Sequence, residues 1–282
     1  MRRSCGWLPV PLVGRALLPY DVTMLQSVSV APANPANSAS PRFFESVGIR
    51  TGSRVLDIGC GNGDLSRFVA RLAGPQGEVV AVDSSDAALA LARAAGGEPD
   101  AAPITYRAAD LAADLHDLGC FDVIVGRRVL MYLPDASATL ARLVGLANPG
   151  AILAFQEHAR ASLPFGLAAL PLHRRLYDWV WDTVAAEGGD VTLGLRLVDQ
   201  MRSQGLSIAQ ARNEGVLIQP GEPSFLPTLM RIMLPRLVEH SVASAEEVQP
   251  DTLVQRIEDE HRAVGGTIVW DQAFLVAGQV TG

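Results

Sequence analysis

The sequence predicts an α/β fold built on a mostly parallel sheet. Short β-branched and apolar runs alternate with segments whose apolar residues recur at helical spacing, and glycine, proline or an acid separates them. Such alternation favours parallel strands joined by right-handed crossovers. A glycine-rich turn follows the first strand, and acids follow the next two strands. We therefore expect a ligand site at the carboxyl edge of the sheet, where folds of this class bind their ligands.

Seven strands and the helices between them follow from these patterns. The expected strands are 53–58, 77–82, 104–108, 121–126, 151–156, 206–219 and 267–276. The expected helices are 41–47, 64–73, 85–95, 137–147, 163–186, 193–204, 225–242 and 251–264. The helix at 64–73 is typical of the set, because its apolar residues fall on one face and Gly74-Pro75 ends it.

Length and composition predict one large domain with a sizeable core. The chain has 282 residues, of which 49% are hydrophobic and 19% charged. Residues 1–40 are expected to be a flexible N-terminal extension, because 29–40 are rich in proline, alanine, asparagine and serine. Residues 41–282 would form the domain. Helical insertions at about 163–186 and 223–264, rich in bulky apolar side chains, would cap the carboxyl edge of the sheet.

Charge, hydropathy and cysteine content exclude several classes of partner. The formal net charge of −7 argues against a nucleic-acid partner, which would need a basic surface. No apolar run approaches the ~18 residues that span a bilayer, so no membrane anchor is expected. The three cysteines, Cys5, Cys60 and Cys120, have no short spacing and predict neither a disulfide framework nor a metal site. This cysteine usage favours a cytoplasmic location.

The stretch from Asp57 to Asp64, Asp-Ile-Gly-Cys-Gly-Asn-Gly-Asp, is the most informative motif. Glycines at alternate positions allow positive φ and a close approach of the backbone to a ligand. The dinucleotide fingerprint G-x-G-x-x-G would place its third glycine at position 64, where an acid would repel a pyrophosphate. No G-K-[ST] of a P-loop follows. A glycine-rich turn without a ligand stays open as the plainer alternative.

The pattern D-x-G-x-G-x-G after a strand resembles motif I of the class I S-adenosylmethionine-dependent methyltransferases. Three further matches follow in the family's order: the acids that end the next two strands, the segment 121–135, and the Asn148-Pro149-Gly150 turn, in which Ala151 replaces a second glycine. The resemblance covers roughly residues 45–157. It implies a Rossmann-like, seven-stranded, mostly parallel sheet with helical cap insertions, whose last strand inserts antiparallel between the fifth and sixth.

S-adenosylmethionine is the cofactor that this resemblance implies. Asp83 would accept hydrogen bonds from the ribose hydroxyls, although it could instead cap the next helix. Asp110 would meet the adenine amine beside the amide of Leu111, or else be a solvated loop acid. Arg127 would orient a carboxylate or be solvated. The residues expected to hold the cofactor are Asp57, Gly59, Cys60, Gly61, Asp83, Ser84, Asp110, Leu111, Gly126 and Arg127.

A general base is needed if the acceptor is a hydroxyl, and two residues at the end of the fifth strand are candidates. His158 is the first candidate because imidazole titrates near neutral pH and the position faces the expected substrate site. Glu157 is the second, since neighbouring strand residues point to opposite faces. A capping or packing role for His158 is the competing interpretation. The four other histidines are expected to be surface or structural residues: His116, His173, His240 and His261.

We therefore expect a methyltransferase that acts on a small, apolar or aromatic molecule, in secondary metabolism. O-methylation is mildly preferred, because no N-P-P-Y motif of amino methylation is present. Two alternatives from other classes stay open. One is a cofactor-bound enzyme that catalyses a cyclisation or rearrangement without methyl transfer, and the other is a non-catalytic binding or regulatory protein. The aromatic residues of the first cap insertion would serve substrate contact, cap packing or a homodimer interface equally well.

Overall fold

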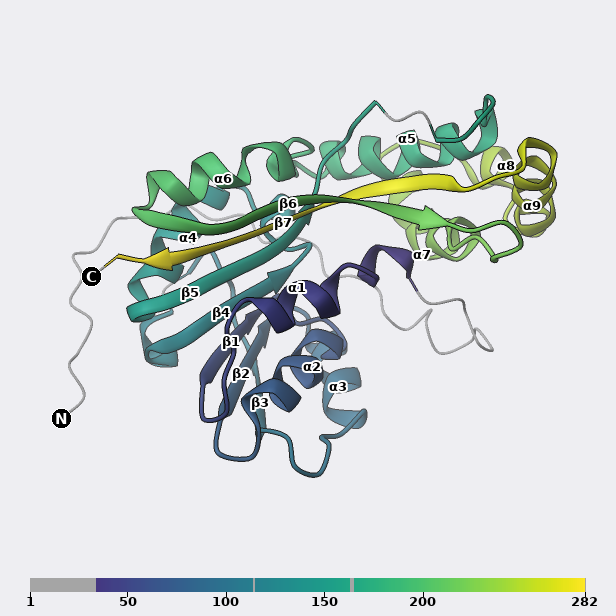
Figure 1. Ribbon diagram of the computed structural model, residues 1–282. Coiled ribbons are helices and arrows are strands. Elements are labelled where there is room, and N and C mark those ends of the chain that lie inside the picture. Colours follow the sequence, from purple (N-terminus) through teal and green to yellow (C-terminus); the bar gives the residue numbers. More distant parts are fainter. Residues whose placement is uncertain (1–33, 114, 163–164, 282) are drawn as a thin grey trace.

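The computed structural model describes residues 34–113, 115–162 and 165–281. Within them seven strands form one sheet in the order β3-β2-β1-β4-β5-β7-β6 (Figure 1). The strands are β1 (Arg54–Ile58), β2 (Glu78–Asp83), β3 (Ile104–Ala108), β4 (Phe121–Arg127), β5 (Ala147–His158), β6 (Leu206–Ile218) and β7 (Ile268–Val280). Strands β1 to β5 pair in parallel, whereas β7 runs antiparallel to both β5 and β6. The Rossmann-like sheet, with the last strand between the fifth and sixth, is confirmed.

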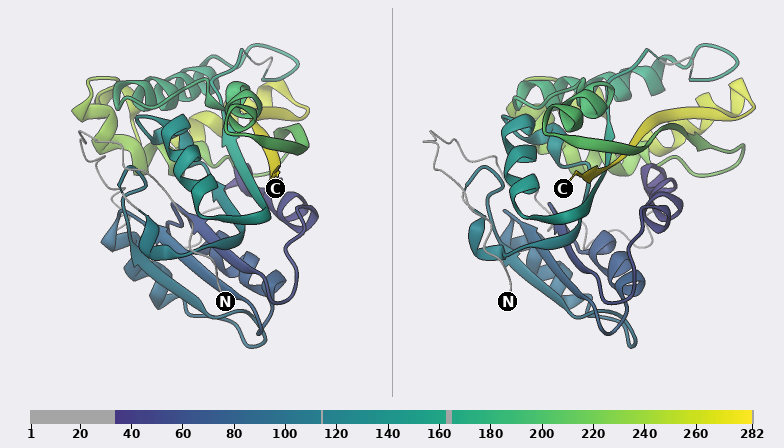
Figure 2. Two further views of the ribbon diagram at one scale, coloured as in Figure 1. Left: turned by 90° about the vertical axis from the view of Figure 1, so that its left-hand side faces the viewer. Right: turned by 60° about the vertical axis from the view of Figure 1, so that its left-hand side comes forward.

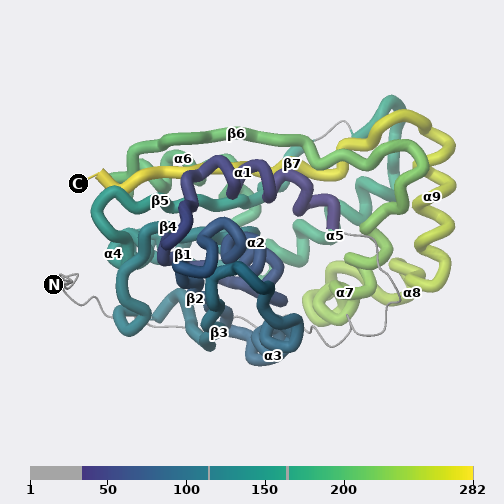
Figure 3. Tube along the Cα trace, turned by 60° about the horizontal axis from the view of Figure 1, so that its bottom comes forward, coloured from purple at the N-terminus to yellow at the C-terminus, as the bar shows by residue number. Residues whose placement is uncertain are grey.

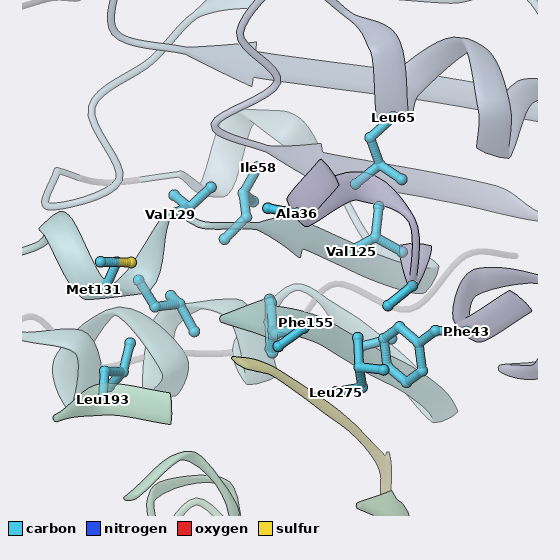
Figure 4. Packing of buried hydrophobic residues seen from close by; sticks show 14 of the residues in the cluster. Ala36, Phe43, Ile58, Leu65, Val125, Val129, Met131, Phe155, Leu193 and Leu275 are labelled. Carbon is cyan, nitrogen blue, oxygen red and sulfur yellow. The ribbon is translucent and has the colours of Figure 1, made fainter. Parts of the chain in front are cut away.

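Helices cover both faces of this sheet. On one face lie α1 (Ser40–Ser46), α2 (Asp64–Ala73) and α3 (Asp86–Ala94); on the other lie α4 (Ala136–Gly145) and α6 (Leu193–Ser203) (Figures 1 and 3). The part of the chain that the structure describes also contains three short 3₁₀ helices: η2 (Pro35–Asn37), η3 (His116–Leu118) and η4 (Leu130–Tyr132). The core lies between the layers, where Phe43 of α1, Ile58 of β1 and Phe155 of β5 are fully buried (Figure 4).

The remaining helices form the cap: α5 (Pro171–Ala186), α7 (Leu226–Glu239), α8 (Ala245–Val248) and α9 (Leu253–Val264). They contact one another at the end of the long β6–β7 pair, which extends beyond the other strands (Figures 1 and 2). These helices fall within the two stretches expected to be insertions. Helix α5 begins later than expected because Pro171 takes its first turn, where a missing N–H costs nothing. Residues 163 and 164 lie outside the described residues.

Strand β5 is longer than the sequence suggests, which changes the setting of the catalytic candidates. The expected strand ended at residue 156, but antiparallel pairing with β7 continues to the pair His158–Ala273. Both Glu157 and His158 are therefore strand residues and not part of a following loop. Pairing with a strand distant in sequence fixes them, which no local pattern could show.

The expectation of a flexible segment up to residue 40 is wrong for residues 34–40. This part contains η2 and the start of α1, and Ala36 and Ala39 are buried. Gln156 of β5 fastens it: its Nε2 donates to the carbonyl of Ala36 (2.6 Å), and its Oε1 accepts from the Ser40 hydroxyl (2.5 Å). Residues 1–33 lie outside the described residues.

Of the cysteines, Cys60 is a free, buried thiol. Cys5 lies outside the described residues. Across 34–113, 115–162 and 165–281, no helix is long and apolar enough to cross a membrane.

Candidate functional site

The glycine turn joins β1 to α2 at the carboxyl edge of the sheet. Gly59, Gly61 and Gly63 have φ values of +58°, +53° and +76°, a region that side chains rarely adopt. A Cβ on Gly59 would lie 2.5 Å from the Val129 side chain, whereas a Cβ on Gly61 would meet nothing within 4 Å. Gly59 is thus required for packing, and the open space beside Gly61 is available to a ligand.

Asp83 ends β2 and faces this turn. One carboxylate oxygen accepts a hydrogen bond from the Gly61 amide (2.8 Å), and the other accepts from the Ser85 amide (2.9 Å). Each oxygen keeps a second lone pair for a ligand. Ser85, and neither Asp83 nor Ser84, caps α3 by accepting from the Ala88 amide. The capping alternative for Asp83 is therefore excluded, and the exposed Ser84 lies beside it.

Asp57 lies buried beneath the turn. Its Oδ2 accepts a 2.5 Å hydrogen bond from the hydroxyl of Ser66 in α2. Its Oδ1 has no hydrogen-bond partner among the described residues. Burial raises the pKa of Asp57 to about 7, although the Ser66 bond works in the opposite direction. A buried oxygen without a partner, below a glycine turn, suits a donor group of a bound ligand.

Arg127, at the end of β4, bridges the turn and the N-terminal segment. Its guanidinium donates to Asp64 (2.7 Å) and to the Ser40 hydroxyl (3.3 Å). Burial raises the pKa of Asp64, but Arg127 outweighs it and holds that pKa below its usual range. These three residues line a cavity of about 240 Å³ between α1 and α2. A larger cavity of about 490 Å³ lies in the cap and contains no residue of the glycine turn.

The other expected cofactor residues occupy the same edge with differing roles. Asp110 accepts from the Ala112 amide (2.8 Å), and Leu111 beside it is buried. Gly126 is needed for packing, because a Cβ there would lie 2.8 Å from Ile58. The amide of Cys60 already donates to a β2 carbonyl, and burial raises the pKa of its thiol. At this edge Asp57 lies near Asp83 and Arg127, and Asp110 follows the neighbouring strand β3. Gly126 and Cys60 shape the backbone.

The carboxylate of Glu157 is engaged by the backbone. Its Oε1 accepts from the amides of Val129 (3.0 Å) and Leu130 (2.8 Å), at the start of η4. The side chain is fully buried, and burial raises its pKa to about 7 despite these bonds. This geometry supports a structural role for Glu157 in holding the segment after β4.

His158 pairs with an acid that sequence reasoning did not identify. Its Nδ1 lies 2.7 Å from Oδ2 of Asp271 on β7, and its Nε2 has no hydrogen-bond partner among the described residues. Both side chains are buried, at 2% and 8% exposure. The available signal was a single acid beside Trp270, in a strand whose other residues are mostly apolar. The residues described here hold no group of three or more His, Cys, Asp or Glu placed to bind a metal ion.

Comparison with known proteins identifies the family. The profile of the methyltransferase domain matches residues 49–206, more than half of the chain. This chain belongs to the class I S-adenosylmethionine-dependent methyltransferases. A ubiquinone biosynthesis O-methyltransferase of Xanthomonas oryzae pv. oryzae is 32% identical over 145 residues. That match spans 49% of this chain and 58% of the relative, so the rest of each protein is not compared.

Solved structures share the fold of the family. An S-adenosylmethionine dependent methyltransferase from Mesorhizobium loti superposes with a TM-score of 0.50 and 20% identity, over 86% of this chain and 97% of that one. The [4+2]-cyclase SpnF gives a TM-score of 0.50 and 19% identity, over 87% and 83%. At these identities the likeness concerns the fold alone. Members of one fold thus include a cyclase, and the chemistry must be argued from the site.

Proposed function

We propose that this protein transfers the methyl group of S-adenosylmethionine to a hydroxyl oxygen of a small, apolar or aromatic molecule. The observation that carries the proposal is the carboxylate of Asp83, held by the Gly61 amide above an open glycine turn. This arrangement offers a ribose two acceptor oxygens and offers the rest of the cofactor a surface without side chains. It occurs in a chain that belongs to a methyltransferase family.

The residues at the edge fit the parts of the cofactor. Asp83 would accept from the ribose hydroxyls, and Asp110 would accept from the adenine amine. The free Oδ1 of Asp57 would accept from the ammonium group, and Arg127 would face the carboxylate. The cofactor itself supplies an electrophilic methyl group when bound. The contribution of the protein is to hold acceptor and methyl group in line, which is worth about 7–11 kcal/mol in favourable cases.

A hydroxyl acceptor is supported by the state of His158. An imidazole whose Nδ1 faces a carboxylate keeps Nε2 as a proton acceptor, which a hydroxyl nucleophile needs and an amine needs less. The relative in Xanthomonas is an O-methyltransferase by name. The cap supports an apolar or aromatic acceptor, because its buried surface includes Phe165, Tyr177 and Trp181. We also propose that the reaction belongs to secondary metabolism.

Transfer of a labelled methyl group tests the proposal. Purified protein would be incubated with S-adenosylmethionine carrying a ¹⁴C methyl group and with matched phenols, anilines and thiophenols. The expected result is label in the phenol, with one S-adenosylhomocysteine formed per methylated product. Label confined to the aniline or thiophenol would overturn O-methylation. An acceptor that is rearranged without label would instead indicate cyclisation chemistry.

A further inference from the structure

The His158–Asp271 pair carries an inference about which acceptors this site accepts. We propose that Asp271 is a positioning residue that holds His158 as a base at Nε2, and that this base restricts the acceptor to acidic hydroxyls, meaning phenols or enols. This inference rests on the proposed methyl transfer and deepens it. Its basis is the 2.7 Å contact between two buried side chains from neighbouring antiparallel strands.

The contact fixes the tautomer of the imidazole. An ionised carboxylate only accepts hydrogen bonds, so Nδ1 of His158 must carry the proton and Nε2 keeps its lone pair. The carboxylate cannot rotate away, because Oδ1 of Asp271 accepts from the Gln272 amide (2.8 Å). The unpartnered, buried Nε2 is therefore an acceptor shielded from water. A buried acceptor without a donor destabilises the folded protein, unless a ligand donates a hydrogen bond to it during function.

The cap contacts the chain just after the strand end that carries His158. Tyr177 of α5 accepts from the amide of Ala161, three residues beyond His158 (3.1 Å). Burial, and then the charge of Asp271, raises the pKa of Tyr177 to about 12, so its hydroxyl stays protonated beside the carboxylate. The bond between Tyr177 and Ala161 thus joins α5 to the chain just after His158. The pair itself comes from β5 and β7, which are distant in sequence, and this explains why no local motif reveals it.

The chemistry of a neutral imidazole sets the substrate class. The acceptor O–H gives its proton to Nε2, and the oxygen lone pair forms the new carbon–oxygen bond. The carbon–sulfur bond breaks with its electron pair going to sulfur, and the imidazolium is balanced by the carboxylate of Asp271. A phenol has a pKa of about 10, whereas an aliphatic hydroxyl resembles water at about 15.7. The ionisation constants of the two hydroxyls therefore differ by nearly six orders of magnitude, which favours phenols and enols as acceptors for this base.

Two phenols of different acidity test this inference in turnover. With 4-propylphenol at neutral pH, Asp271→Asn is expected to lower turnover by about 10²–10⁴-fold, because an amide donor favours the wrong tautomer. With 4-nitrophenol, which is about half ionised near neutral pH, the loss should shrink to less than about tenfold, since the ionised fraction needs no base. Affinity for S-adenosylmethionine should not change. Asp259→Asn, at an exposed acid of α9, is the control. Equal losses on both phenols would overturn the inference.

A spectroscopic measurement separates this inference from methyl transfer itself. The chain has five histidines, so the ¹⁵N ring signals of His158 can be assigned by comparison with His158→Ala. The wild type should show the Nδ1–H tautomer at neutral pH, and Asp271→Asn should show Nε2–H. A wild type with the Nε2–H tautomer contradicts the inference, whatever the enzyme does with acceptors. A correct tautomer without transfer to any phenol would instead overturn the proposed function.

Discussion

Residues at the carboxyl edge divide into those that shape the backbone and those that present polar atoms. Gly59 and Gly126 are needed because side chains from β1 and from the segment after β4 occupy the space of a Cβ. Asp57, Asp83 and His158 each present a buried or half-buried polar atom with spare hydrogen-bonding capacity. The first group fixes the shape of the edge, and the second group supplies the polar atoms on which the proposed function rests.

Substitution of two glycines separates backbone strain from steric clash. Gly52→Ala adds a Cβ at φ +87° in open space and should cost about 1–2 kcal/mol. Gly59→Ala adds both a positive φ and a 2.5 Å clash with Val129, so it should cost about 2–5 kcal/mol. Urea unfolding measures both. Equal losses in the free energy of unfolding would show that the Val129 side chain can move aside. Gly59 would then not be explained by packing.

A second variant tests the structural role of Glu157. Its pKa is raised from 4.5 to about 7 in the folded state, so the unfolded state loses its proton first as pH rises. Stability should therefore fall between pH 4.5 and 7, by about 3 kcal/mol in all. Glu157→Gln should remove this fall, measured by urea unfolding across that range, and should keep turnover within about threefold. Glu98→Gln at an exposed ion pair is the control. A turnover loss above 100-fold without loss of stability would make Glu157 catalytic.

The sequence predicts those features of the site whose residues are close together in the chain. The glycine spacing and the acids that end β2 and β3 are local features, and they led to the correct cofactor family. The partner of His158 lies 113 residues away and is brought close by β5–β7 pairing. The same holds for Gln156, which reaches back 120 residues to Ala36. Such contacts depend on the register between strands, which no single segment of the sequence predicts.

At the scale of elements, the cap is joined by contacts between α5 and α9. The Glu260 carboxylate of α9 accepts from the amides of Leu172 (2.7 Å) and His173 (2.9 Å), satisfying donors at the start of α5. Nδ1 of the buried His173 lies 3.1 Å from Nε2 of His261. Two imidazoles at this distance share one hydrogen bond only while at least one of them is neutral.

The contact between His173 and His261 predicts that acid lowers the free energy of unfolding. Burial, and then His261, lowers the pKa of His173 from 6.5 to about 3, so the folded state binds fewer protons than the unfolded state. Stability is complete above pH 6.5 and should fall by about 1.4 kcal/mol for each pH unit below it, as far as pH 3. Urea unfolding of His173→Gln at pH 7.5 and 5.5 should show a smaller loss than wild type. His116→Gln, an exposed histidine in η3, should keep the wild-type loss, and equal losses in all three would contradict this account.

Element boundaries show where local patterns stop being informative. Strands β1 to β4 and helices α2 and α3 were placed within a few residues, because each is bounded by glycine, proline or an acid. Strand β5 was placed too short, since its last residues are held by β7 and not by their own pattern. Helix α5 was placed too early, because the apolar residues before Pro171 resemble a helical face without forming one.

At the scale of the whole molecule, the N-terminal segment closes one side of the site. Residues 34–46 pack on the face that carries α2 (Figure 3). Ser40 contacts both Gln156 of β5 and Arg127 of β4. The cap lies beyond the carboxyl ends of the strands (Figure 1). The carboxyl edge of the sheet is thus bounded by the N-terminal segment and the cap, which come from separate parts of the sequence.

Two glutamines that hold α1 and η2 to the sheet provide a matched test. Gln156→Ala removes two buried hydrogen bonds and leaves the Ser40 hydroxyl and the Ala36 carbonyl without this partner. We expect a cost of about 2–5 kcal/mol in the free energy of unfolding, measured in urea. Gln210→Ala removes exposed bonds to Ser46 and should cost less than about 1 kcal/mol. A reversed order would show that the N-terminal segment contributes little to the folded molecule.

We propose that the glycine turn and Asp83 form the site for S-adenosylmethionine. Isothermal titration calorimetry of the cofactor into the protein measures this binding without any acceptor. The wild type should bind one equivalent, and Asp83→Ala should weaken binding by about 10–100-fold, because the ribose hydroxyls lose a charged acceptor. Asp86→Ala, in the first turn of α3, should bind as the wild type does. A wild type that does not bind, or an Asp83→Ala variant with unchanged affinity, would contradict the account.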